Sequence, residues 1–188
     1  MSDVAGQVRE EPLDARQEAR RRAALAQIRQ YGDPALRLRA REVESFDREL
    51  ERLVARMTAL MEDANGVGLA GNQVGVLRRV LVARPDPEAP PIALVNPRIV
   101  ERDTCVEVDD EGCLSLQGVL VPVERSHAVT VDARDVEGEQ LTLELEGLAA
   151  RVLQHEIDHL DGVLIVDQTT DEARREALAV LRPRILLA

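Results

Sequence analysis

The chain has 188 residues, a net charge of −11 at pH 7 and 45% hydrophobic residues, but its only aromatic residues are Tyr31 and Phe46. This size and hydrophobic content suit one domain around one buried core. The scarcity of aromatic side chains argues against functions that need stacked rings, such as single-strand nucleic-acid platforms and methyl-ammonium cages. All 24 basic residues are arginine, so no lysine is present for a Schiff base or a phosphate-binding loop.

The charge is unevenly distributed. Residues 61–172 carry a net charge of −15, whereas residues 1–60 carry +1 and residues 173–188 carry +3. The acidic middle would repel a phosphate backbone, so we expect no nucleic-acid binding there. No apolar run approaches the length of a membrane span, and the N-terminus lacks the apolar stretch of a signal peptide. Two cysteines, Cys105 and Cys113, are too few for a disulfide framework, and a cytoplasmic location is expected.

The predicted elements come in blocks of helices and strands. Good helix formers predict a helix over residues 14–30, and apolar residues three and four apart predict a clearer one over 47–63. Short β-branched or alternating runs then predict strands at residues 80–83, 92–95, 119–123, 128–133 and 141–146. A helix over residues 148–160 follows, and a last one begins near Thr170, with capping-box spacing at Thr169 and Glu172. This order predicts an α+β domain with mostly antiparallel strands.

Two of the three histidines, His155 and His159, lie four residues apart on a predicted helix. Positions four apart share a helix face, with Cβ atoms roughly 5–6 Å apart, so both imidazoles can reach one divalent metal ion. Glu156, next to the first histidine, can then act on a water at that ion. The same pattern also occurs by chance on polar helix faces. The mostly apolar circumference of this helix favours a metal, because buried histidines need partners.

Two histidines leave a metal site short of one ligand. Downstream, Asp171 and Glu176 are available, although both fall in a helix predicted to face solvent. Upstream, Cys113 offers a thiolate, which is a strong ligand for iron and zinc. A lone cysteine is more often a small buried hydrophobe, which is our interpretation of Cys105. From the residues alone, both sources of the third ligand remain open.

A glycine-rich stretch over residues 66–75 would let the backbone approach a ligand closely, because four of its ten residues are glycine. It follows a predicted helix and lacks a βαβ context, so it does not fit a dinucleotide-binding loop. Gln73 within it carries a neutral amide that can donate to a developing oxyanion. A lone glutamine is, however, more often a residue of a surface turn.

The three motifs, in this order, resemble those of the peptide deformylase family. That family carries a Gly-x-Gly-Leu-Ala-x-x-Gln loop, a Glu-Gly-Cys-Leu-Ser segment and a His-Glu-x-Asp-His helix, matched here by residues 66–73, 111–115 and 155–159. The resemblance covers about residues 28–168. It implies mostly antiparallel strands packed around a central metal-binding helix. It also implies a hydrolase that removes the formyl group from the N-terminal formyl-methionine of newly made proteins and releases formate.

The resemblance also implies domain limits and partners. A catalytic domain would span residues 28–170, preceded by a partly helical extension over 1–27 and followed by a C-terminal helix over 171–188. The expected partner is the formyl-methionyl end of a nascent peptide, with no membrane. The basic last helix adds the hypothesis of docking on the ribosome.

The site residues follow from the same resemblance. The metal ligands would be Cys113, His155 and His159. The ion would be Fe(II) by the habit of the family, although one thiolate and two imidazoles suit zinc, nickel or cobalt equally well. The catalytic groups would be the carboxylate of Glu156 as general base, and the amide of Gln73 with the backbone N–H of Leu114 as oxyanion donors.

Contacts with the substrate are expected from Val67, Gly68, Arg125 and Val152. Arg125 would reach the carbonyl groups of the peptide, although a surface arginine is an equally good interpretation. Because Tyr31 and Phe46 lie far from the motifs in sequence, we expect the methionine pocket to have aliphatic walls, formed by side chains such as Val67, Leu114 and Val152. Asp158 should face away from the metal and pair with an arginine. One departure from the family, Gly71 in place of its usual alanine, is expected to loosen the glycine-rich loop.

Two alternatives remain. A general metallopeptidase would use a downstream carboxylate as third ligand and leave Cys113 without a role. A metal-binding or ribosome-associated module without turnover would have no need of Glu156 or Gln73, and the presence of both residues disfavours it.

Overall fold

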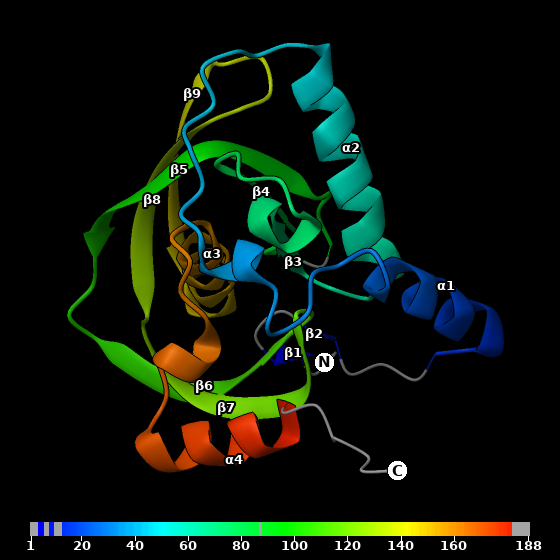
Figure 1. The fold of residues 1–188 in the computed structure, drawn as a ribbon. Coiled ribbons are helices and arrows are strands. Elements are labelled where there is room, and N and C mark those ends of the chain that lie inside the picture. Colours follow the sequence, from blue (N-terminus) through cyan, green and yellow to red (C-terminus); the bar gives the residue numbers. More distant parts are fainter. Residues whose placement is uncertain (1–3, 6–7, 10–12, 87, 182–188) are drawn as a thin grey trace.

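The computed structural model of the protein describes residues 4–5, 8–9, 13–86 and 88–181. Figure 1 shows two antiparallel sheets with helix α3 (Gly147–Leu160) seen end-on between them. The larger sheet has the strand order β3-β4-β5-β8-β9, and the smaller sheet pairs β6 with β7. The expected α+β fold, with antiparallel strands around a central helix, is therefore confirmed.

The larger sheet is built from β3 (Gly68–Ala70), β4 (Val80–Ala83), β5 (Ile92–Arg102), β8 (Ala128–Arg134) and β9 (Gln140–Glu146). The smaller one comprises β6 (Val106–Cys113) and β7 (Leu116–Ser126). A pair of two-residue strands, β1 (Val4–Ala5) and β2 (Val8–Arg9), lies against β6. Every described pairing between the named strands is antiparallel. Antiparallel strands can be joined by short connections, whereas parallel strands need a long crossover.

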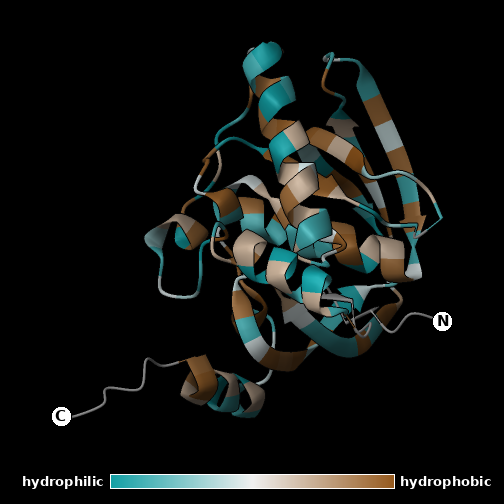
Figure 2. Cartoon of the chain, turned by 90° about the vertical axis from the view of Figure 1, so that its right-hand side faces the viewer, coloured by the Kyte–Doolittle hydropathy of each residue, from teal (hydrophilic) through white to brown (hydrophobic). Residues whose placement is uncertain are grey.

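Helix α2 (Arg48–Asp63) covers one side of the core. Asp47 caps it by accepting from the N–H groups of Glu49 and Leu50, and Leu50, Met57, Leu60 and Met61 are buried along one face. Figure 2 shows hydrophobic and hydrophilic residues alternating along this helix, as expected for one apolar face on the core. Helix α4 (Asp171–Leu181) packs on β7.

The first helix, α1 (Ala15–Leu25), ends earlier than the sequence predicts. Asp14 caps its start as expected, but the chain leaves the helix after Leu25. The reason is tertiary, because the N–H of Arg29 donates to the carbonyl of Gln73 at 2.7 Å and the N–H of Tyr31 donates to that of Ser115 at 2.8 Å. Those two bonds tie the segment to the glycine-rich loop and to the turn after Cys113.

The strands also differ from the predicted ones in extent. β5 and β7 are each 11 residues long, and the predicted runs covered only part of them. The sequence does not predict β6, because only Val106 and Val108 alternate with acidic residues before the acidic run of residues 109–111. At the last helix the cap is Thr170, which accepts from the N–H of Ala173, whereas Thr169 donates to the carbonyl of Pro122. Proline cannot continue a helix, so the sequence predicts that the last helix ends at Pro183, which lies outside the described residues.

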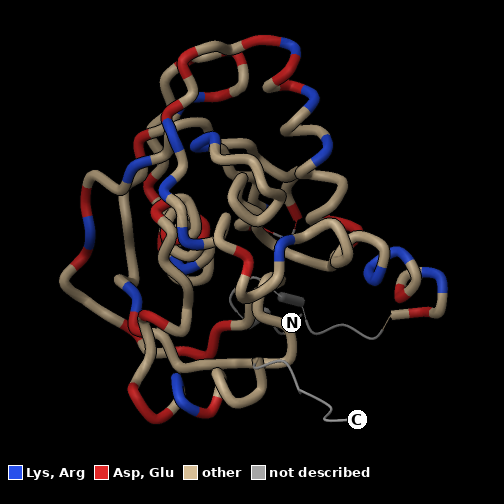
Figure 3. Tube along the Cα trace, in the orientation of Figure 1, with Lys and Arg blue, Asp and Glu red and all other residues tan. Residues whose placement is uncertain are grey.

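The charge pattern follows the elements. Figure 3 shows acidic residues along β6 and arginines along α1 and α2. Four residues of the acidic middle, Glu107, Asp109, Asp110 and Glu111, therefore lie on the strand that ends at Cys113.

Candidate active site

Helix α3 and the end of β6 bring the predicted metal ligands together. Cys113, His155 and His159 are buried, with 2%, 1% and 1% of their surfaces exposed. Each offers one donor atom, and the three donor atoms lie within 4.8 Å of one another. The Sγ of Cys113 is 3.2 Å from the Nε2 of His159. Among the described residues, this is the group of three His, Cys, Asp or Glu side chains that could hold a metal ion.

This donor set fits a divalent metal ion. The Nδ1 of His155 is hydrogen-bonded to Glu111 at 3.0 Å, whereas the buried Nε2 has no hydrogen-bond partner in the described part of the chain. An imidazole held by a carboxylate at one nitrogen, with the other nitrogen facing a thiolate group, is a usual arrangement at metal sites. Neither Asp171 nor Glu176 belongs to the converging group. The site therefore does not support the metallopeptidase alternative with a downstream carboxylate ligand.

The carboxylate of Glu111 is the centre of a buried ion-pair network, which the sequence patterns did not indicate. Its two oxygens accept from the Nε and Nη2 of Arg125, both at 2.9 Å, and from the Nη1 of Arg151 at 2.9 Å. Arg151 also donates to the backbone carbonyls of Val123 and Glu107, both at 2.9 Å. The network thus connects β6, β7 and α3 and fixes the ring orientation of His155.

The same network sets the ionisation of its members. Burial raises the pKa of Glu111, but hydrogen bonds from His155 and Arg125 outweigh this effect and hold the pKa well below its ordinary value. Burial lowers the pKa of His155, whereas the neighbouring side chains of Cys113 and Glu111 raise it, and the net pKa lies well above the ordinary value. Burial and the nearby positive charges of His155 and Arg125 together lower the pKa of His159. A metal ion would displace the proton of His155, because ligands bind in their deprotonated forms.

Replacing Glu111 by glutamine is expected to destabilise the protein by about 3–5 kcal/mol, because two buried arginines lose their shared counter-charge. We also expect the affinity for the metal ion to fall about 10–100-fold, since His155 loses the carboxylate that orients it. Urea unfolding and metal titration measure the two effects. The matched control is Glu107→Gln, a half-exposed residue of the same strand, which should change stability by less than about 1 kcal/mol. Equal effects of the two substitutions would contradict the role of Glu111.

Gln73 lies beside the metal ligands. Its Oε1 accepts from the N–H of Ala70 at 2.9 Å, and its Nε2 donates to the Oγ of Ser115 at 3.1 Å. The same Nε2 is 3.8 Å from the Sγ of Cys113. These bonds hold the amide donor toward the site, and Gln73 is fully buried rather than part of a surface turn. Ser115 is a further site residue that sequence reasoning missed, although it stands in the Glu-Gly-Cys-Leu-Ser motif.

Glu156 is fully buried on α3, and its carboxylate lies against Gly68 of β3. A Cβ atom placed on Gly68 would lie 2.2 Å from the Oε1 of Glu156 and 2.6 Å from its Cδ. A larger residue at position 68 would therefore force the Glu156 side chain to move, in addition to altering any contact with a substrate. At Gly71 an added Cβ would meet the carbonyl oxygens of Arg78 and Val76 at 2.7 and 2.8 Å, so the backbone is tightly enclosed there. The expected loosening of the loop by this glycine stays a prediction.

Gly68→Ala is expected to displace the Glu156 carboxylate and to lower kcat about 100-fold, while the metal content stays unchanged. The three heavy atoms nearest to the added methyl group all belong to Glu156, the expected general base, and small displacements of such a group cost about this much. The control is Gly147→Ala, where the positive φ of 56° would strain the alanine but an added Cβ atom meets nothing within 4 Å. A Gly68→Ala enzyme with wild-type kcat would rule out the placement of Glu156 described above.

Arg125 does not have the predicted role. It is buried, and its nitrogens are engaged by Glu111 and by Asp158. It is therefore neither a surface arginine nor free for the carbonyls of a peptide, and it acts as a positioning residue. Its partner Asp158 meets the expectation of pairing with an arginine. The charge of Glu111, followed by that of Asp158, raises the pKa of Arg125 against the effect of burial, which lowers it.

The residues proposed for the methionine pocket lie in two adjoining apolar clusters. Val67 and Val152 are buried in the same cluster, and Leu114 belongs to another one that includes residues of α2. The argument that aromatic residues are remote from the site is wrong for Tyr31, because the fold packs its side chain against the cluster that contains Cys113.

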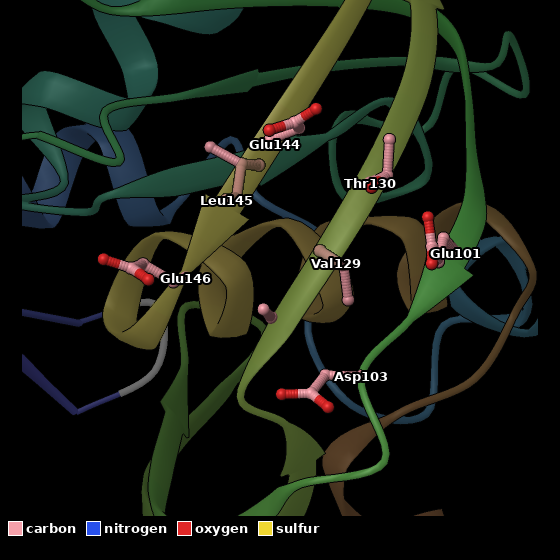
Figure 4. Close-up of a pocket in the computed structure, with 8 residues that line it drawn as sticks. Glu101, Asp103, Val129, Thr130, Glu144, Leu145 and Glu146 are labelled. Carbon is pink, nitrogen blue, oxygen red and sulfur yellow. The ribbon is translucent and has the colours of Figure 1, made fainter.

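An acidic hollow lies on the larger sheet and is separate from this site (Figure 4). It has a volume of about 660 Å³, and the carboxylates on its wall belong to Glu101, Asp103, Glu144 and Glu146. None of the predicted site residues lines it.

A buried Cys–His–His group, with a glutamate next to the first histidine on the same helix, defines a metal-dependent hydrolase. The sequence pattern of the polypeptide deformylase family matches residues 25–175. The chain is 46% identical over 153 residues to a peptide deformylase of Desulforudis audaxviator, covering 81% of this chain and 99% of the relative. The chain therefore belongs to the peptide deformylase family.

Solved structures give the same result. The crystal structure of peptide deformylase from Thermotoga maritima matches with a TM-score of 0.74 and 46% identity, over 76% of this chain and 96% of that one. Peptide deformylase 1B of Arabidopsis thaliana, in complex with an inhibitor, matches with a TM-score of 0.77 and 39% identity, over 82% and 89% of the two chains.

The chain is accordingly an enzyme, a metal-dependent hydrolase that removes the N-formyl group from nascent peptides. Its substrates are formyl-methionyl peptides. In the described part of the chain, no helix combines the length and apolar character needed to span a membrane.

Proposed function

We propose that Cys113, His155 and His159 hold the divalent metal ion of the deformylation reaction and that Glu156 is its general base. The observation that carries this proposal is the buried group of three donor atoms within 4.8 Å of one another. Three protein ligands leave a fourth position open, which is the arrangement of catalytic metal sites. The neighbouring carboxylate of Glu156 is buried on the same helix.

Side chains and backbone groups of the protein carry out the proton transfers and stabilise the developing negative charge. A bound divalent ion lowers the pKa of a water and polarises a carbonyl group. Glu156 accepts a proton from the attacking water, and the water oxygen bonds to the formyl carbon. The Gln73 amide and the backbone N–H of Leu114 donate to the carbonyl oxygen as it gains negative charge. The formyl C–N bond then breaks, Glu156 returns the proton to the leaving amine, and formate departs.

We propose Fe(II) as the metal ion, while zinc, nickel and cobalt suit the same ligands. The test is formate release from a formyl-Met peptide by protein loaded with Fe(II) under anaerobic conditions. We expect turnover that declines on exposure to oxygen, because a thiolate and a ferrous ion are both oxidisable. If the protein releases no formate with Fe(II), zinc, nickel or cobalt, each tested in turn, the proposal is overturned. Turnover that is stable in air with Fe(II) would contradict the choice of metal and its ligand set.

The substrate would bind next to these groups. We propose that Val67 and Gly68 contact the backbone of the peptide and that Val152 helps to form the methionine pocket. The burial of Val67 and Val152 in one apolar cluster beside α3 supports this placement. We take residues 28–170 as the catalytic domain, with residues 1–27 and 171–188 as flanking elements.

We propose a cytoplasmic location and a contact between α4 and the ribosome. Both fit an enzyme whose substrates are nascent peptides. We expect the charge reversal Arg174→Glu with Arg175→Glu to reduce co-sedimentation with ribosomes several-fold at low salt, because the contact would be electrostatic. Substitution is preferable to deletion of the helix, since Ala177 of α4 is buried against the core. The matched control is Arg48→Glu with Arg52→Glu on the exposed face of α2. Unchanged co-sedimentation of the α4 variant would exclude this contact.

A further inference from the structure

Helix α1, except for its last residue, precedes the part of the chain that matches the family. The match begins at residue 25, whereas α1 spans Ala15–Leu25. The helix is nevertheless docked on the rest of the protein. It packs beside α2 (Figure 1), and the Nε of Arg21 donates to the carbonyl of Ala64, just after α2, at 3.4 Å.

A groove runs between α1 and the turn that joins β6 to β7. One cavity of about 630 Å³ has Arg21 and Leu25 on one wall; Gly112, Cys113, Leu114 and residues 116–120 complete its lining. A second cavity of about 880 Å³ shares Arg21, Leu25 and Gln117 with the first and continues along α1. We call these two cavities the α1 groove. Because Cys113 and Leu114 line its first cavity, the groove borders the candidate metal site.

The α1 groove changes character along its length. Near Cys113 its walls are largely apolar and include Leu25, Leu116 and Val119. Farther out its charged lining residues are Arg21, Arg22 and one acid, Glu18, beside the apolar Leu13, Leu25 and Ala26. Helix α1 carries four arginines and a single glutamate, in a protein with a net charge of −11 (Figure 3). Arg21 is half-buried, and none of the ion pairs between described residues involves Arg21 or Arg22.

We propose that the α1 groove receives the residues that follow formyl-methionine in the substrate, and that Arg21 selects peptides with acidic side chains there. The proposal rests on the proposed function, because the formylated end must lie at Cys113 for the chain to continue along α1. The substrate class is then a formyl-methionyl peptide with an apolar or small second residue and acidic residues after it. The guanidinium of Arg21, tethered at Nε, would pair with such a carboxylate through its terminal nitrogens.

The test compares kcat/KM for two amidated substrates, formyl-Met-Ala-Glu-Glu and formyl-Met-Ala-Lys-Lys, with formyl-Met-Ala amide measured in parallel. We expect wild-type enzyme to prefer the acidic peptide about fivefold, as one partly exposed ion pair allows. Arg21→Gln should abolish the preference and Arg21→Glu should reverse it, mainly through KM. The matched control is Arg20→Gln, an exposed residue of the same helix outside the groove lining, which should keep the preference.

Each outcome decides one point. Equal kcat/KM for the two tetrapeptides in wild-type enzyme, or a preference that survives Arg21→Glu, overturns the role of Arg21. Failure to release formate from formyl-Met-Ala amide overturns the proposed function itself, and this proposal with it. Thermal unfolding of each variant shows whether the loss of the contact with Ala64 has released α1 from the domain.

Discussion

Cys113→Ser is expected to remove the metal ion from the protein and to lower kcat/KM at least about 1000-fold. A serine hydroxyl is not ionised near neutral pH and is a poor ligand for iron or zinc, so two imidazoles alone would have to hold the ion. Without the ion the reaction loses its activation of water, which is worth several kcal/mol. Metal content per chain and formate release from a formyl-Met peptide are the two measurements.

Cys105 offers the matched control, because it is the other cysteine of the chain and is exposed. Cys105→Ser should keep both metal and activity. If Cys113→Ser instead kept a full complement of metal and wild-type turnover, the third ligand would have to come from elsewhere. The general metallopeptidase interpretation would then return.

Glu156→Gln has the second largest expected effect, a fall in kcat of about 10²–10⁴-fold with the metal content unchanged. Glutamine keeps the size of the side chain but cannot accept a proton, so the general-base step is lost. The ligand set does not include Glu156, and the ion should therefore remain bound. Single-turnover formate release and metal analysis of the same sample measure both quantities.

Glu144→Gln, an exposed carboxylate of β9, controls for the loss of one negative charge and should leave kcat unchanged. Wild-type kcat in Glu156→Gln would exclude the general-base role. Loss of the metal ion from that variant would show instead that the carboxylate helps to bind it.

The sequence predicted most of the metal site because helix geometry is local. His155, Glu156 and His159 share one helix, and their spacing alone places the two imidazoles on one face. Cys113 lies 42 residues before His155 on another element, and spacing gives no relation between them. Spacing alone therefore leaves the identity of the third ligand open. The family resemblance indicates Cys113, and the fold places β6 beside α3.

The sequence did not predict the groups that support the ligands. Glu111 stood in a recognised motif without a role, and Arg125 was assigned to the substrate. Both roles depend on a buried ion-pair network between β6, β7 and α3, and such contacts are set by tertiary packing rather than by local pattern. The steric demand at Gly68 likewise arises because β3 passes directly over Glu156.

The extension before residue 28 also contains contacts that local sequence pattern does not predict. Its composition predicted a helix with a solvated arginine face, and α1 does have exposed arginines. That Arg21 and Leu25 line a groove leading to Cys113 depends on how α1 docks beside α2. Sequence composition contains no information about that docking.

The most direct test of the central claim is X-ray absorption at the zinc edge of protein loaded with one zinc ion. A site formed by Cys113, His155 and His159 predicts one sulfur at about 2.3 Å, two imidazole nitrogens at about 2.0–2.1 Å and one further light atom. A spectrum with nitrogen and oxygen neighbours alone, and no sulfur, would contradict the ligand set.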